Sequence, residues 1–176
     1  MYKVESDFEY KGYRCVVIFG DMGHRCGYVG LSKGHPLYGI NYNDRLDIPK
    51  VDMEDKEIGK RGIISLLLNA LDYDENIRMD LYFDVHGSLT YSDGNGNYPV
   101  ESDLWWLGFD CGHYGDGKDF DLVESYWGDE EYIQKRLEIE RQYYSDYPVR
   151  SKEYVESECR SLVDQIMELE FHIYGR

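Results

Sequence analysis

The sequence predicts an α+β fold: an antiparallel or mixed sheet with C-terminal helices packed on it. In the first two thirds of the chain, short apolar runs are bounded by glycine and turn residues, which is typical of strands. From Gly128 onward, apolar residues recur at helical spacing instead. Strands followed by helices, rather than alternating with them, indicate this class. The 176 residues suit a single domain, residues 1–176.

The chain opens with the pattern of a hairpin. Phe8 and Tyr10 alternate with polar residues and lead into Lys11-Gly12. The apolar run 13–19 follows, so we expect a largely buried second strand. A short third strand is expected at 28–31.

The middle of the chain is less regular. Residues 32–43 are rich in Gly, Pro and Tyr and predict an ordered loop, and residues 44–60 are charged, with Pro49 as a breaker. The apolar residues of 62–71 suit a short helix, although a strand is not excluded by periodicity.

Two further strands are expected. One covers residues 79–91, ending near Gly87 and resuming at 89–91. The turn sequence 92–97 follows, and the apolar run 104–109 predicts the last strand.

Two helices are predicted near the C-terminus. Acidic residues at 129–131 suit the first turn of one helix, which ends at Tyr147-Pro148. Ser151 is a good N-cap for the other. Its apolar stripe consists of Val155, Cys159, Leu162, Val163, Ile166 and Met167.

The charge balance limits the classes of partner. With 19 basic and 35 acidic residues, the net charge is −16. Such a surface repels nucleic acid and acidic membranes and suits a basic protein partner or cations. No secretory signal opens the chain and no run has the length of a spanning helix, so we expect a cytoplasmic protein with reduced thiols. Monomers and small homo-oligomers both remain open.

Three pairs of polar residues stand where apolar runs end in glycine. In each pair the residues are two positions apart, so they point the same way in an extended chain. The pairs are His24 with Cys26, Asp84 with His86, and Cys111 with His113. The other cysteines, Cys15 and Cys159, lie in apolar patterns and are expected in the core.

Histidine, cysteine and carboxylate are the ligands that zinc prefers. We therefore predict a zinc site in which three or four residues of one set bind the ion: His24, His86, Asp110, Cys111 and His113. Asp84 and Asp116 would orient the histidines. We expect His35 and His172 at the surface.

Blander interpretations stay open. No standard zinc motif and no P-loop is present, and these histidines could simply form hydrogen bonds at a polar sheet end. A Cys–His nucleophile at Cys111 or Cys26 has no local signature. The acidic, tyrosine-rich segment 116–146 is either a solvated face or a protein-binding surface.

Four runs resemble a family of small proteins from bacteriophages and mobile elements of Gram-positive bacteria. They are GHRCGYVG at 23–30, KGHPLYG at 33–39, DVHGSLTY at 84–91 and LWWLGFDCGHYGD at 104–116. One branch of such phage proteins inhibits type II Cas9 as anti-CRISPR proteins, and this chain is similar in size and acidity. The resemblance implies an inhibitor that binds Cas9 through its acidic surface in the host cytoplasm, blocks nucleic-acid loading and carries a structural zinc.

Two other functions remain open. A metal-dependent hydrolase could use the same cluster, with Asp116 or Asp84 as general base. Alternatively, the protein could be an interaction module that binds a partner without a metal.

Overall fold

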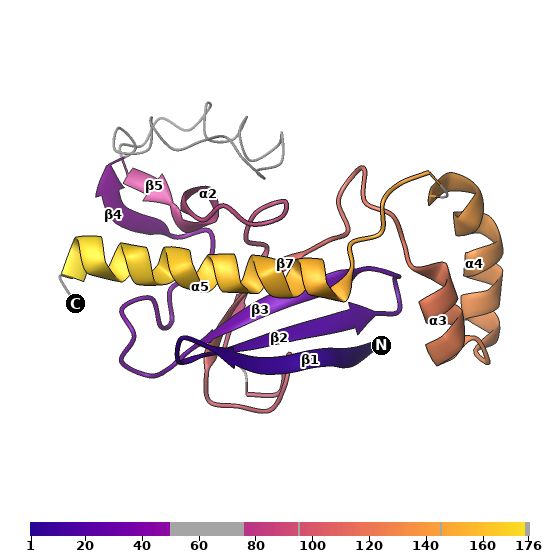
Figure 1. Ribbon diagram of the computed structural model, residues 1–176, viewed down its shortest axis with the longest axis horizontal. Helices are drawn as coiled ribbons and strands as arrows, with labels where there is room; N and C mark the ends of the chain where they lie inside the picture. The colour runs from indigo at the N-terminus through magenta and orange to yellow at the C-terminus, as the bar shows by residue number, and fades with distance from the viewer. Residues whose placement is uncertain (50–75, 95, 145, 175–176) are drawn as a thin grey trace.

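The computed structural model describes residues 1–49, 76–94, 96–144 and 146–174. Five strands pair in the order β1-β2-β3-β7-β6, and every pairing is antiparallel. These strands are β1 (Tyr2–Tyr10), β2 (Tyr13–Gly20), β3 (Arg25–Leu31), β6 (Tyr91–Asp93) and β7 (Trp105–Asp110). The C-terminal helix lies along one face of this sheet (Figure 1). The predicted α+β class is therefore confirmed, with an antiparallel sheet.

The two faces of the sheet bury different side chains. Along β2, Cys15 and Val17 contribute to the core cluster under the C-terminal helix. Val16 and Ile18 pack on the opposite face, where the segment between β6 and β7 covers them. This alternation follows from the period of two in a strand, and both faces are apolar because both are covered.

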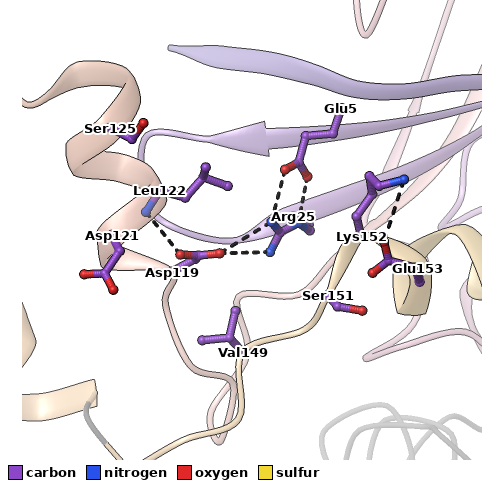
Figure 2. A pocket seen from close by; sticks show the side chains of 10 residues that line it. All are labelled: Glu5, Arg25, Asp119, Asp121, Leu122, Ser125, Val149, Ser151, Lys152 and Glu153. Carbon is purple, nitrogen blue, oxygen red and sulfur yellow. Dashed lines mark hydrogen bonds and ion pairs between the residues drawn. The ribbon is translucent and has the colours of Figure 1, made fainter.

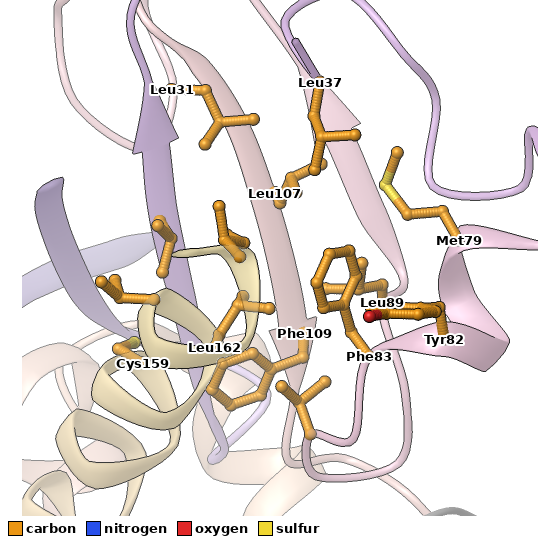
Figure 3. Close-up of a cluster of buried hydrophobic side chains, with 14 of the residues drawn as sticks. Leu31, Leu37, Met79, Tyr82, Phe83, Leu89, Leu107, Phe109, Cys159 and Leu162 are labelled. Atoms are coloured by element: carbon orange, nitrogen blue, oxygen red, sulfur yellow. The ribbon is translucent and has the colours of Figure 1, made fainter. Parts of the chain in front are cut away.

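The last helix, α5 (Lys152–Tyr174), closes the main core. The Ser151 hydroxyl accepts a hydrogen bond from the Tyr154 backbone N–H at 3.2 Å, which confirms the predicted N-cap. Figure 3 shows Cys159 and Leu162 lying against Phe109 of β7. The predicted stripe is fully buried at Val155, Cys159, Leu162, Val163 and Ile166. Each fully buried aliphatic side chain contributes about 1.5–3 kcal/mol.

One position of that stripe was predicted wrongly. Met167 is 39% exposed, and Leu169 is buried in its place. The face of α5 that contacts the sheet therefore continues from Ile166 to Leu169, at a spacing of three residues, rather than to the adjacent position.

Two helices form a separate cluster, next to α5 in the chain but beyond the end of the sheet (Figure 1). The predicted helix near Gly128 is α4 (Glu131–Tyr144). It packs with α3 (Phe120–Trp127), a helix that is not predicted from the sequence. Because α3 is only 8 residues long and buries Phe120, Val123 and Trp127, its apolar signal is short. Asp119 caps it by accepting from the Leu122 N–H at 3.1 Å.

The strand expected at 79–91 is wrong except at Tyr91, which is the first residue of β6. Residues Met79–Tyr82 form a helical turn, α2, and a loop then leads to β6. All four residues of α2 are buried, so neither a helical nor an alternating pattern marks them. A second sheet pairs β4 (Arg45–Pro49) with β5 (Asn76–Arg78). The apolar run 62–71 lies outside the described residues.

Candidate metal centre

Two loops and the start of α5 meet at one end of the main sheet. One loop, residues 83–90, runs from α2 to β6, and the other, residues 111–118, follows β7. They bring together His86, His113 and Asp116, whose ligand atoms all lie within 4.8 Å of one another. In the described part of the chain this is the group that could hold a metal ion.

Asp116 is the centre of the group and is only 4% exposed. Its Oδ2 lies 2.7 Å from His86 Nε2 and accepts the His113 backbone N–H at 3.1 Å. Its Oδ1 accepts from Arg150 Nε at 2.9 Å. Burial alone would raise the pKa of Asp116, but the interactions with His113, His86 and Arg150 outweigh burial and hold the pKa well below its usual range. The carboxylate is therefore ionised.

His86 is held by contacts at both of its ring nitrogens and at its backbone N–H. Its Nδ1 lies 3.1 Å from the Tyr154 hydroxyl, and its backbone N–H donates to Glu158 of α5 at 2.9 Å. With the residue 9% exposed, the ring is fixed with Nε2 directed at Asp116. Such support from outside the ligand set is what orients histidines in metal sites.

His113 has the free nitrogen of the group. Its Nδ1 is buried without a hydrogen-bond partner among the described residues. It lies 3.7 Å from Asp116 Oδ2, beyond hydrogen-bond distance, and 3.9 Å from Asp110 Oδ1. The attraction of Asp116 raises the pKa of His113. A buried nitrogen that faces two carboxylates is a position that suits a cation.

The backbone beside His86 makes room for the His113 ring. Gly87 has a φ of +74°, and a Cβ at this position would lie 2.1 Å from His113 Cε1. The next residue, Ser88, has a φ of 126° although it is not glycine. Strained backbone of this kind persists where the surrounding structure requires it, often at functional sites.

A pocket of about 410 Å³ opens beside the group. His113 and Asp116 form part of its wall, and Lys118 and His24 form another part. The other lining residues are Met22, Cys111, Gly112, Tyr114, Gly115, Gly117, Tyr144 and Tyr147. A metal ion at the group would therefore lie next to a space large enough for a small molecule.

The predicted ligand set is only partly brought together. His86 and His113 belong to the group, and Asp116, expected only to orient histidines, completes it. His24 lines the pocket, and burial lowers its pKa. Asp110 accepts from the Gly112 N–H at 2.9 Å.

Cys111 also lies outside the group. The residue is 1% exposed and belongs to the main core. Burial raises the pKa of its thiol, which disfavours the thiolate that zinc and nucleophilic catalysis need. Cys15 and Cys159 are buried as expected.

His35 does not lie at the surface as the sequence indicated. Its side chain is 6% exposed, and Nε2 lies 3.1 Å from Glu170 Oε1 on α5. Nδ1 accepts the Leu37 backbone N–H at 3.0 Å, so the ring proton is on Nε2. The loop folds back onto α5, which its local sequence does not reveal. The side chain of His172 lies outside the described residues.

A larger pocket of about 750 Å³ lies near the N-terminus of α3 (Figure 2). Its floor holds Arg25, which binds Glu5 through two hydrogen bonds of 2.7 and 3.0 Å. Arg25 also lies 3.5 Å from Asp119 and donates to the Arg150 carbonyl at 3.0 Å. Its guanidinium is thus engaged in joining β1, β3, α3 and the segment before α5, which is a structural role.

Arg150 and Tyr154 are site residues that sequence reasoning missed. They lie 34 and 38 positions after Asp116 in the chain, and no local pattern connects them to it. A backbone hydrogen bond from Gly117 to Pro148, at 2.9 Å, brings the two segments together.

No family model, curated protein or solved structure matches this chain in the three comparisons made with known proteins. Among the helices of the described ranges, none combines the length and the apolar character needed to cross a membrane.

Proposed function

We propose that this protein binds a zinc ion through His86, His113 and Asp116 and acts as a metal-dependent hydrolase. One observation carries the proposal: the three ligand atoms converge within 4.8 Å, and two of the three residues, His113 and Asp116, line a pocket. Catalytic zinc sites keep three protein ligands and one open position, whereas structural sites use four protein ligands. The described group has three, so it supports an open site better than a closed structural one.

The donor types, two imidazole nitrogens and one carboxylate oxygen, are ones that zinc binds. With bonds of about 2.0–2.1 Å, two ligands of a tetrahedral zinc lie roughly 3.3 Å apart. The Asp116 carboxylate is 2.7 Å from His86 Nε2 and 3.7 Å from His113 Nδ1, on either side of that spacing. The same donor set also suits ferrous iron, and elemental analysis distinguishes the two metals.

The protein's own residues prepare the site. The Tyr154 hydroxyl can accept a hydrogen bond from His86 Nδ1–H, and this tautomer leaves Nε2 free as a ligand. Arg150 holds the second oxygen of Asp116, which fixes the carboxylate plane. When bound, zinc lowers the pKa of a coordinated water toward about 7 and polarises the bond to be cleaved.

Elemental analysis of the untagged protein tests the ligand assignment. We expect about one zinc per chain, and a loss of both metal and stability in His113→Ala and His86→Ala. His24→Ala is the matched control, because His24 lines the same pocket outside the group. Unchanged metal content in both ligand variants would overturn the assignment.

Hydrolysis is tested on the same samples. Phosphate and carboxylate esters of p-nitrophenol should be cleaved by the zinc-loaded protein, and cleavage should fall on treatment with a chelator and in His113→Ala. If the zinc-loaded protein cleaves none of these esters, the proposed hydrolase activity is wrong, although the protein still binds metal.

We also propose a second candidate function, an anti-CRISPR-type inhibitor that binds a basic protein such as Cas9. The net charge of −16 and a row of exposed side chains favour it. Tyr132, Ile139 and Tyr143 of α4 are 52, 60 and 72% exposed. Aromatic side chains on an acidic protein suit a basic partner, and the association should weaken with salt.

A cleavage assay decides this second candidate. Titration into a Cas9 reaction should stop DNA cleavage at an equimolar ratio, and His113→Ala should inhibit as well as the parent chain. Full cleavage at a tenfold excess of inhibitor would exclude this function.

A further inference from the structure

The pocket beside the metal group, which consists of His86, His113 and Asp116, is lined on one side by aromatic residues. Tyr114, Tyr144 and Tyr147 all line it. The ring centroids of Tyr114 and Tyr147 are 5.9 Å apart, and those of Tyr147 and Tyr144 are 6.5 Å apart, with edge-to-face geometry in both pairs. Three neighbouring segments of the fold thus place a row of tyrosine rings next to His113 and Asp116.

Tyr114 is the most exposed member of this row. It lies between His113 and Asp116 in the chain and is 98% exposed, although it borders a pocket. Its ring contacts Tyr147 edge-to-face, and the described residues cover almost none of the Tyr114 side chain. An aromatic ring presented in this way offers its surface for stacking a planar group.

The pocket can also receive an anion once a divalent metal is bound. Lys118 lies in its wall, with Nζ 3.0 Å from Glu140 and 4.4 Å from the Tyr144 ring centroid. Arg150 forms an ion pair with Asp116, with Nε 2.9 Å from Oδ1. Apart from its histidines, the charged residues that line the pocket are Asp116 and Lys118, whose charges cancel, so a divalent ion makes the sum positive. In a chain of net charge −16, this positive charge is local.

We propose that this pocket binds a nucleoside monophosphate, with its base on Tyr114 and its phosphate toward the metal group. The inference rests on the proposed metal centre and names the ligand class of that site. A pocket of about 410 Å³ is of a suitable size for a small ligand. A single nucleotide carries little charge compared with a nucleic acid, which the acidic surface repels.

Calorimetry with the zinc-loaded full chain tests the inference, using AMP, adenosine and inorganic phosphate as ligands. AMP should bind at least tenfold more tightly than either of the other two. Tyr114→Ala should weaken AMP binding about tenfold, the size expected for one lost base–aromatic stack, while zinc content stays unchanged. Because Tyr114 is 98% exposed, this variant should fold. Tyr143→Ala is the control, since Tyr143 is exposed but does not line the pocket.

The outcomes separate the two proposals. If zinc binds but AMP binds no more tightly than phosphate, or if Tyr114→Ala binds AMP like the parent chain, the nucleotide inference is wrong and the metal centre stands. If the protein takes up no metal, the proposed function fails, and the nucleotide inference fails with it.

Discussion

Gly87 determines where the His113 ring can lie. Its φ of +74° is in the left-handed region, and an added Cβ would lie 2.1 Å from the ring. Glycine is required twice, for the backbone conformation and for the space. The arrangement of the metal group therefore depends on Gly87, which has no side chain that could bind a metal.

Gly87→Ala should lower zinc affinity by at least tenfold and destabilise the fold by about 1–2 kcal/mol for the backbone conformation alone. Gly39→Ala is a matched control: φ is +83° and nothing lies within 4 Å of the added Cβ. It should lose similar stability and keep its zinc affinity. Equal zinc affinity in the two variants, measured by competition with a chromogenic chelator, would show that Gly87 does not position His113.

Asp116 couples the site to pH. Its pKa is lowered in the folded protein, so its contribution to stability is present above the unfolded value of about 3.9 and is lost as the pH falls through that value and below. Asp116→Asn should cost about 2–3 kcal/mol at pH 7, because Arg150 and His86 lose an ionised partner. Urea unfolding should also show a flatter decline between about pH 5 and pH 3 in the variant. Parallel declines in the two proteins would argue against this role.

At the scale of elements, α5 joins the parts of the fold. Its first turns hold Tyr154 and Glu158 against His86, and its last turns hold Glu170 against His35 and Tyr13. The loop that carries His35 is therefore fastened to the helix through a neutral imidazole. Protonation would place a second proton on Nδ1, where the Leu37 N–H already donates.

His35 should make this fastening sensitive to acid. Burial lowers its pKa in the folded protein, so the unfolded chain binds the proton first, and stability is lost as the pH falls below about 6.5. His35→Gln should be less stable at pH 7 but should lose less of its remaining stability between pH 7 and pH 5. Urea midpoints at pH 7, 6 and 5 measure this difference. A pH dependence as steep as that of the parent chain would show that His35 is not responsible.

At the scale of the whole molecule, the net charge of −16 works against the compact state. Raising NaCl from about 10 mM to 0.5 M shortens the screening distance from about 30 Å to a few ångströms and should raise the melting temperature at pH 7. Each kcal/mol gained corresponds to about 2–4 °C in a chain of this size. At pH 4.6, the calculated isoelectric point, the increase should vanish. An equal increase at both pH values would point to a salt effect unrelated to net charge.

The sequence predicted those parts of the fold whose signal is local. The β1–β2 hairpin, β3, β7, α4 and most of the buried stripe of α5 follow from short-range periodicity and turn residues. It failed for α2, where all four residues are buried, and for α3, which is short. Burial on all sides and short length both remove the periodic contrast on which such predictions depend.

The candidate site was predictable only as a region. The amino-acid sequence by itself determined that histidines and carboxylates follow apolar segments, and it therefore indicated His86 and His113 among five candidate ligands, with Asp116 expected only to orient histidines. Only the tertiary structure decided that His86 and Asp116, 30 positions apart, lie 2.7 Å from each other while Cys111 enters the core. Distances between segments depend on how α5 and the sheet pack, and packing is a property of the whole chain.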